Sequence, residues 1–404
     1  MANVNDMVVH QASTVLNSLV AQATGQATLT ASTPGEFVSV AQTALKTGYD
    51  PILNAMSQMW GRTIFSIRPY TRKFKGMEMS LDRWGNACRK ISVAEQPVKD
   101  DKRFDYPAGY DVNMDPVDGN GESVDMFQMN KPDILQTNFY GQSVYENIYT
   151  VFRDNLDVAF TGPEEFMRFN SMVAQNRSDK LEQYRETIAR GLLMNYIMSI
   201  LEENQSDRVV HLMTEYYGMT EQQPSQVNLF QPANFKPFME FVYSRIANIS
   251  RMMSERSEMF QTVINGKHVM RHTPPNKQKV YLISRYMDMF DAMVKANTFH
   301  DNYLKYTDYE GVNFWQSIDD PETINAVATY TKTDGTVGTG TKVTNQGKIF
   351  GVIFDENALG YAQVNAWNSL TPFNPVGGYW NDVDHVNFRT IQDMTEKGVV
   401  LLLD

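Results

Sequence analysis

Residues 161–204 constrain the fold of this chain most, because they have the pattern of one long helix. Pro163 and Glu164 suit a first helical turn, with Thr161 as the N-cap and Glu164 as its capping-box partner. Apolar residues then recur at three- and four-residue steps, the spacing of one helix face: Phe166, Phe169, Val173, Leu181, Tyr184, Ile188, Leu192, Tyr196 and Ile200. A helix of about forty residues extends roughly 60 Å.

A helix of this length needs an equally long surface to pack on, which favours an elongated subunit over a compact enzyme domain. Gly191 and the polar step at residues 175–178 are the places where the sequence favours a break in the helix.

Charge and cysteine content exclude several classes of protein. The net charge of −11 argues against a nucleic-acid binder of the basic-patch kind. The single cysteine, Cys88, cannot form an intramolecular disulfide. The sequence has neither a signal-peptide pattern nor an apolar run of membrane-spanning length, so we expect a protein made in the cytoplasm without membrane contact.

Residues 1–60 have the pattern of an arm. Apolar residues between Val8 and Val20 fit a short amphipathic helix, and a second helical pattern over residues 37–59 is interrupted by Gly48 and Pro51. The segment has too few large apolar residues to form a core of its own. The alternative is a disordered tail.

Residues 61–135 read as an extended β-hairpin. Residues 64–67 form an apolar strand pattern, residues 77–82 and 124–129 alternate apolar and polar side chains, and a polar excursion at 93–133 lies between the alternating stretches. A projecting hairpin has little core of its own and usually lies on a neighbouring molecule. We therefore expect subunit-interface residues here: Arg72, Lys73, Lys75, Met77, Met79, Trp84, Arg89, Lys90, Met126 and Phe127.

The basic run formed by Arg68, Arg72, Lys73 and Lys75 leaves two interpretations open. One is a nucleic-acid patch, and the other, which we favour, is a solvated face or a set of partners for an acidic surface.

The remaining sequence alternates strands and helices. Residues 139–149 read as a strand and 150–160 as a short helix. Residues 205–375 read as an α/β domain with a mixed sheet, including strands at 280–283 and 349–354 and an exposed loop at 329–347. Residues 399–403 are apolar on both faces, as a central strand requires.

Catalytic patterns are weak. His268 and His272 are four residues apart but lack a glutamate between them, and residues 382–385 (Asp-Val-Asp-His) fit a polar strand edge better than a cation site. The glycines at 335–340 lack the Gly-Lys-Ser/Thr of a phosphate loop. The sequence therefore assigns no catalytic, metal or cofactor residues.

Three stretches carry a resemblance to a known family. They are residues 64–81, with Lys-Phe-Lys-Gly at 73–76 before an alternating strand, residues 139–160, with Phe-Tyr-Gly-Gln at 139–142, and residues 374–381, Asn-Pro-Val-Gly-Gly-Tyr-Trp-Asn. Together with the order of elements, they resemble the major capsid proteins of tailed phages (the Hong Kong ninety-seven type fold), and among these the capsid proteins of small short-tailed phages.

The resemblance implies an α+β capsid fold. Residues 1–60 would be the N-terminal arm, 61–135 the extended loop, and 136–204 the peripheral domain with a spine helix. Residues 205–375 would be the axial domain, and 376–404 the return strands that complete both domains.

The function implied by the resemblance is structural. The chain would assemble in the host cytoplasm into pentamers and hexamers of an icosahedral or prolate shell around double-stranded DNA, and become part of the virion. The chain has no long charged N-terminal coiled-coil segment, so the resemblance implies a separate scaffolding protein or unaided assembly. It would also meet a portal protein and, non-specifically, packaged DNA. The alternatives are an encapsulin-like compartment and an intracellular metal-dependent enzyme.

Overall fold

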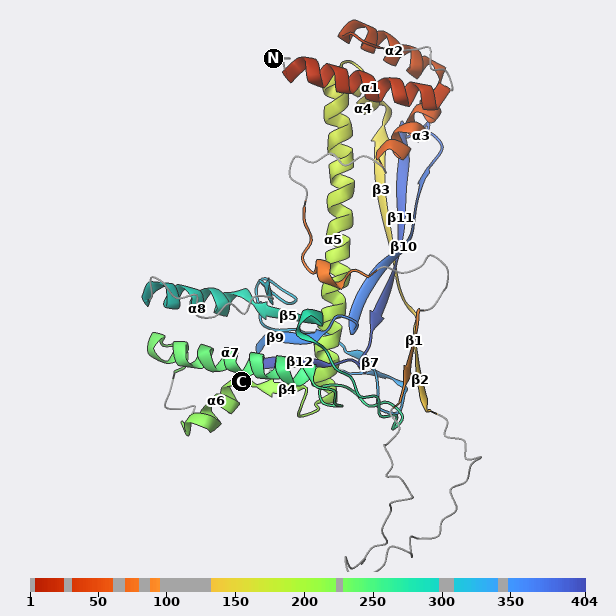
Figure 1. Cartoon of the computed structure of the whole chain (residues 1–404). Coiled ribbons are helices and arrows are strands. Elements are labelled where there is room, and N and C mark those ends of the chain that lie inside the picture. The colour runs from red at the N-terminus through yellow and green to blue at the C-terminus, as the bar shows by residue number, and fades with distance from the viewer. Residues whose placement is uncertain are drawn as a thin grey trace, which may run out of the picture. The chain divides into compact units, whose positions relative to one another are not determined.

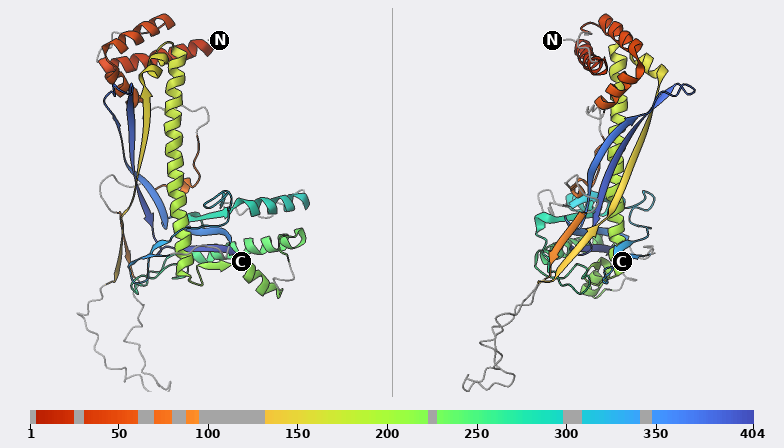
Figure 2. Two further views of the ribbon diagram at one scale, coloured as in Figure 1. Left: turned by 180° about the vertical axis from the view of Figure 1, so that it is seen from behind. Right: turned by 90° about the vertical axis from the view of Figure 1, so that its right-hand side faces the viewer.

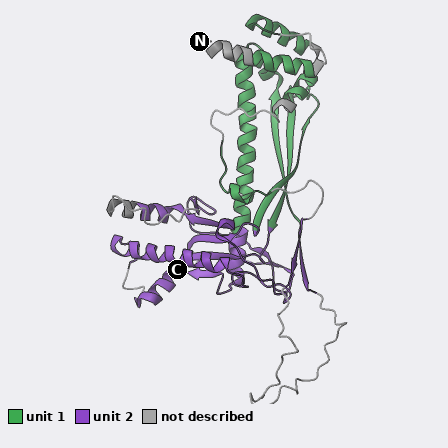
Figure 3. Cartoon of the chain, viewed as in Figure 1, with its two compact units in different colours: residues 1–86, 140–194, 359–391 green, residues 87–139, 195–358, 392–404 purple. Residues whose placement is uncertain are grey.

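The computed structural model describes residues 4–24, 31–60, 70–79, 88–94, 132–222, 228–297, 309–340 and 348–404. The chain divides into two compact units (Figure 3). Unit 1 contains Met1–Asn86, Tyr140–Met194 and Leu359–Ile391, and unit 2 contains Ala87–Phe139, Asn195–Ala358 and Gln392–Asp404. The domain ranges predicted from the sequence stay a prediction.

Helix α5, Pro163–Glu203, is a single helix of 41 residues, as the sequence predicts (Figure 1). The predicted breaks are wrong, because both Gly191 and residues 175–178 lie within it. Gly191 costs about 1 kcal/mol relative to alanine in a helix, and Arg177 is anchored by buried ion pairs, so tertiary contacts outweigh the local preference.

The predicted N-cap of α5 is also wrong. The Thr161 hydroxyl donates to the carbonyl of Val158 at 2.6 Å, at the end of the preceding helix. The Phe166 N–H donates to the carbonyl of Gly162 at 3.0 Å, so the first turn of α5 starts at Gly162. The Thr161 hydroxyl therefore binds at the C-terminal end of the preceding helix and does not cap α5.

Unit 1 has a three-stranded sheet in the order β10 (Leu359–Leu370), β11 (Tyr379–Gln392) and β3 (Gly141–Phe152) (Figure 2). β11 and β3 are antiparallel, from Tyr379 opposite Phe152 to Thr390 opposite Gly141. The predicted strand at 139–149 and helix at 150–160 correspond to β3 and α4, Arg153–Ala159. Exposure alternates along β3, because one face of the sheet packs against α5 and the other is open.

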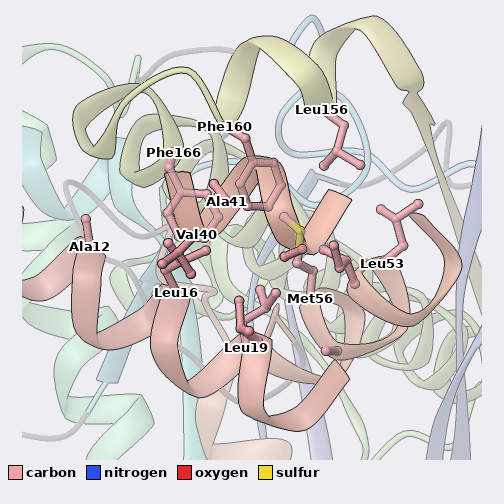
Figure 4. Packing of buried hydrophobic residues seen from close by; sticks show 14 of the residues in the cluster. Ala12, Leu16, Leu19, Val40, Ala41, Leu53, Met56, Leu156, Phe160 and Phe166 are labelled. Carbon is pink, nitrogen blue, oxygen red and sulfur yellow. The ribbon is translucent and has the colours of Figure 1, made fainter. Parts of the chain in front are cut away.

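The N-terminal helices are α1 (Val4–Thr24), α2 (Pro34–Thr47) and α3 (Tyr49–Trp60). Gly48, with φ of +144°, separates α2 from α3 as the sequence predicts. Leu16, Val40 and Met56 pack with Phe160 and Phe166 in one buried cluster (Figure 4). The described arm residues therefore obtain their core from α4 and α5, and the disordered-tail alternative is wrong for them.

Unit 2 has a mixed five-stranded sheet in the order β4-β12-β9-β5-β6. These strands are β4 (Val209–His211), β12 (Gly398–Leu403), β9 (Lys348–Asp355), β5 (Gln278–Ile283) and β6 (Tyr309–Val312). The predicted central strand at the C-terminal end is confirmed, because every residue of β12 is buried and β4 and β9 flank it. Besides the C-terminal end of α5, the described part of this unit contains the helices α6 (Leu212–Thr220), α7 (Pro232–Ser254) and α8 (Ser284–Asn297).

The predicted loop at 329–347 is wrong in its first part. Strands β7 (Thr329–Thr331) and β8 (Val337–Thr339) pair antiparallel there. Gly335, with φ of +79°, lies in the turn that joins them, and the Gly335 N–H donates to the carbonyl of Lys332. The glycines at 335 and 338 thus belong to a hairpin, which agrees with rejecting a phosphate loop.

The strand predicted at 77–82 is wrong where the structure describes it. Residues Lys75–Met77 form a 3-10 turn, and Glu78 makes only an isolated bridge to Tyr361. Phe74 and Met77 are both buried, and their spacing of three fits a turn rather than an alternating strand. The predicted elements at 64–67 and 124–129 lie outside the described residues.

The strand pairing in this region instead involves β1 (Cys88–Val93) and β2 (Ile134–Phe139), which form a two-stranded antiparallel ribbon in unit 2. Cys88 lies opposite Phe139, and Val93 lies opposite Ile134. We refer to β1 and β2 together as the ribbon.

Phe37 gives a test of arm docking. Its ring is fully buried and packs edge-on against Phe166, with ring centroids 5.6 Å apart. We expect Phe37→Ala to lower the free energy of unfolding by about 3–5 kcal/mol, measured by urea denaturation of the unassembled subunit. The exposed Gln42→Ala on the same helix should change it by less than about 0.5 kcal/mol. Equal stability of the two variants would contradict the packing described.

Candidate subunit interface

The predicted interface residues fall into three groups. Residues Arg72, Lys73, Lys75, Met77 and Met79 lie on the segment 70–79, and Arg89 and Lys90 lie on β1. Trp84, Met126 and Phe127 lie outside the described residues. Their contact with another subunit stays a prediction, but the contacts within the chain show which side chains are accessible.

Arg72 is engaged within unit 1. Its guanidinium Nη1 donates to Glu182 Oε1 on α5 at 2.7 Å, its Nε donates to the Tyr361 hydroxyl at 3.1 Å, and its Nη2 pairs with Glu78. Only 9% of the Arg72 side chain is exposed. Acidic side chains therefore do pair with Arg72, as the favoured interpretation of the basic run expects, but these side chains belong to the same chain.

The rest of the segment 70–79 is fastened to α5 in a similar way. The Tyr70 N–H donates to Asp179 at 3.0 Å, and both the Tyr70 hydroxyl and the Lys73 N–H donate to Glu186. The hydrogen bond to Glu186 raises the pKa of Tyr70 to about 12. Met77 is buried, whereas Lys75 is exposed, so of these two only Lys75 is accessible to another subunit.

The ribbon has two unlike faces. On one face the side chains of Ile91 and Val93 are each 58% exposed, and Ile134 is 51% exposed. Arg89, Gln136 and Asn138 are the other exposed side chains of the ribbon. This face is apolar at one end and carries one charge, Arg89, toward the other.

The opposite face of the ribbon is anchored by buried charges of unit 2. Lys90 Nζ pairs with Asp393 Oδ2 at 2.7 Å and with Glu396, and Arg271 Nη1 pairs with Glu396 Oε1 at 2.8 Å. Burial alone would raise the pKa of Asp393, but Lys90 outweighs it and the pKa is lowered. Burial does raise the pKa of Glu396, despite the two cations.

Apolar contacts complete the anchor. Ala94 and Leu135 pack with Ile264 and Val269 in a small buried cluster. The Arg271 guanidinium also donates to the Ser92 hydroxyl at 3.0 Å. The anchored face is thus held in place by unit 2, which leaves the other face turned outward.

A second exposed apolar face lies on the sheet of unit 1. Val144 and Ile148 are each 54% exposed and Phe152 is 47% exposed, all on β3. On the neighbouring strands, Trp367 is 51% exposed and stacks on His385 with ring centroids 4.0 Å apart. The sequence analysis missed this face, although the spacing of four between the exposed apolar residues of β3 was visible in it.

Three of the candidate metal ligands, His268, Asp382 and Asp384, are engaged in other contacts. His268 Nδ1 lies 2.8 Å from Glu258 Oε1 on an exposed loop. Asp382 and Asp384 pair with Arg177 and accept from Asn368. Across the described ranges, no group of three or more metal-ligating side chains is found. The polar strand edge that we favoured over a cation site is also wrong, because these aspartates lie on β11, the middle strand of the sheet, and Asp382 is fully buried against Arg177.

Comparison with known proteins decides the family. The sequence profile of the Phi29-like phage major capsid protein family matches residues 16–389. This chain belongs to that family. It is thus a phage major capsid protein and a structural component of the virion, and the expected resemblance is confirmed.

Solved structures agree on the fold of this capsid protein. A chain of the capsid structure of Staphylococcus phage Andhra is similar over 85% of this chain and 87% of that chain, with 12% identity and a TM-score of 0.53. A chain in the structure of the head fiber and inner core protein of native bacteriophage P68 is similar over 84% and 87%, with 12% identity and a TM-score of 0.52. No curated protein sequence gave a match.

The family assignment decides between the alternatives. It supports a homo-oligomeric shell protein and leaves the encapsulin-like compartment and the metal-dependent enzyme without support. Within the described residues, no helix is both long enough and apolar enough to span a membrane.

The ion pairs of Arg177 give a test of how this capsid protein holds α5 to its sheet. Arg177 is 8% exposed and Asp382 is fully buried, so Arg177→Met leaves a buried charge unpaired. We expect a loss of about 3–5 kcal/mol in the free energy of unfolding, measured by urea denaturation. Arg168→Met on the same helix removes a cation that is 74% exposed and should cost less than about 1 kcal/mol. Similar losses in both variants would contradict a special role for Arg177.

The acid side of the stability profile gives a further test. Burial would raise the pKa of Glu182, but the pairs with Arg72 and Arg185 lower it below 4.5, and Glu186 is lowered similarly by Tyr70 and Arg190. These carboxylates stabilise the fold fully above the unfolded pKa of about 4.5, and this is lost as pH falls through the lower folded pKa. We expect the urea concentration at the unfolding midpoint of the wild type to decrease as the pH is lowered below 4.5. In the double variant Glu182→Gln/Glu186→Gln this decrease should be smaller. If the urea midpoint of the double variant depends on pH as steeply as that of the wild type, this assignment is refuted.

Proposed function

We propose that this capsid protein is the repeating subunit of a closed shell built from pentamers and hexamers, icosahedral or prolate, around double-stranded DNA. The ribbon is the observation that carries the proposal. Its inner face is fixed by buried ion pairs, while its outer face exposes Ile91, Val93 and Ile134. Exposed apolar side chains on a fixed ribbon are stabilised when a neighbouring subunit covers them.

Each range of residues has a separate role in the proposed shell. In this proposal residues 61–135 act as the extended loop on a neighbouring subunit, and residues 1–60 as the arm. The peripheral domain comprises 136–204 and the axial domain 205–375, with 376–404 as return strands. Contacts between unlike surfaces of identical subunits generate rings, which is the geometry a shell requires.

The proposed partners are a separate scaffolding protein, a portal protein and packaged DNA. The described residues of α1 and α2 carry few charges and fit no built-in charged coiled coil, which supports a separate scaffold. The net charge of −11 supports only non-specific contact with DNA. The chain contributes contacts rather than catalysis.

The experiment that tests shell formation is the size of the purified protein. Light scattering followed by negative-stain imaging should show closed shells, or five- and six-membered rings, alone or with the scaffolding protein of the same phage. A compact monomer under all of these conditions would overturn the proposal.

The ribbon contact gives a sharper prediction. Ile91→Asp places a charge on a side chain that is 58% exposed in the subunit, so we expect a folded subunit with unchanged thermal stability. Covering that charge with a neighbour is costly, so shell yield by sedimentation should fall strongly. Ile91→Val keeps the surface apolar and should assemble normally. Normal shells from Ile91→Asp would show that this face is not an interface.

A further inference from the structure

The edge of the unit 1 sheet formed by β3 has open backbone groups. Among the described residues, β11 is the only sheet neighbour of β3. The Arg153 N–H donates to the Gly378 carbonyl at 3.0 Å and continues the register in which Phe152 lies opposite Tyr379. Because N–H and C=O groups alternate sides along a strand, the odd-numbered residues of β3 face β11. The even-numbered residues therefore direct their N–H and C=O groups to the open edge.

The exposed side chains of β3 belong to the same even-numbered residues. Val144, Ile148 and Phe152 are apolar and about half exposed, and Glu146 and Thr150 are exposed between them. The pattern is symmetric about Ile148, with an apolar residue four positions away on each side and a polar residue two positions away. A long edge with such side chains is a template for another strand.

We propose that β3 pairs antiparallel with β3 of a second copy of this chain, about a twofold axis at Ile148. In this register Ile148 lies opposite its symmetry mate, Val144 lies opposite Phe152 of the second copy, and Glu146 lies opposite Thr150. Directly opposite apolar pairs stabilise a sheet. The two sheets become one six-stranded sheet, with α5 of each copy on the same face.

The neighbouring symmetric registers are less favourable. A twofold axis at Glu146 pairs Val144 with Ile148 but places two carboxylates opposite each other. An axis at Thr150 pairs Ile148 with Phe152 but leaves Val144 without an apolar partner, because β3 ends at Phe152. An axis at Asn147 places Glu146 opposite Ile148 and Val144 opposite Thr150. The axis at Ile148 gives the most apolar pairs, because Ile148 lies opposite its mate and Val144 lies opposite Phe152 on both sides. It also places no two acidic side chains opposite each other, where like charges would destabilise the sheet.

The symmetric pattern of side chains indicates that the partner of the β3 edge is a second copy of the same chain. An isologous contact requires a surface that is complementary to itself, and the even-numbered residues of β3 meet that condition. Two carbonyl groups of the even-numbered residues already accept a hydrogen bond. The Val144 carbonyl accepts from the Tyr184 hydroxyl at 3.3 Å, and the carbonyl of Phe152, the N-cap of α4, accepts from within that helix. A carbonyl oxygen has two lone pairs, so it can also accept from a paired strand.

Disulfide trapping in assembled particles tests the pairing and its register. The variant is Ile148→Cys in a Cys88→Ser background, because Cys88 is the single native cysteine. Opposed residues at the axis have Cα atoms about 5.5 Å apart, within the range that a disulfide spans. We expect mild oxidation of shells to give a reducible dimer on a denaturing gel.

Thr150→Cys in the same background is the matched control. Its two symmetry mates would lie four residues apart along the paired strands, roughly 13 Å, so no dimer should form. Particles assembled from a mixture of Val144→Cys and Phe152→Cys chains should crosslink, whereas either variant alone should not. Absence of the Ile148→Cys dimer in intact shells, or equal crosslinking of Thr150→Cys, would overturn the inference.

The inference rests on the proposed shell, and the two fail in different ways. If the wild type forms no shell by imaging, the proposed function fails. If shells form in the Ile148→Cys variant but remain monomeric after oxidation, the shell proposal stands and only the β3 pairing is refuted.

Discussion

The ion pairs between α5 and β11 are the constraint on which unit 1 depends. Arg177, near the middle of a 41-residue helix, meets Asp382 at 2.8 Å and also pairs with Asp384. A buried charge is tolerated only when it is paired in good geometry, so this contact fixes one register of the helix on the strand. Asn368 donates to both aspartates and extends the same constraint to β10. These contacts therefore determine which face of the sheet packs against α5, and the opposite face remains exposed.

A shell subunit must keep its own fold while it presents surfaces for its neighbours. The ribbon meets this need through one face fixed by Lys90, Arg271 and their carboxylate partners and another that exposes aliphatic side chains. The sheet of unit 1 does the same through α5 on one face and exposed Val144, Ile148 and Trp367 on the other. In both cases charged or polar contacts within the chain hold the element, and apolar surface remains for assembly.

Much of the fold was predictable because its periodicity is strong. The repeat of three and four residues in α5 and the continuous apolar run of β12 gave correct elements. The strand predicted at 77–82 was wrong in its described part, because Lys75–Met77 form a turn in which Met77 is buried. The neighbouring Phe74 ring lies under the Arg190 guanidinium of α5, a contact that alternation in the sequence does not reveal. Of the predicted interface residues, Arg72 is engaged and Met77 is buried within the chain, and the partner of Arg72 on α5, Glu182, lies 110 residues away in the sequence.

The sequence by itself determined the class of protein and the order of its elements, because these follow from local periodicity, composition and motifs carried by short stretches. Only the tertiary structure decided which surfaces are exposed. Exposure of Ile91 or Ile148 depends on what covers the other face of its strand, and for each strand that partner is distant in sequence. A strand with alternating side chains has two possible inner faces, and long-range ion pairs and packing choose between them.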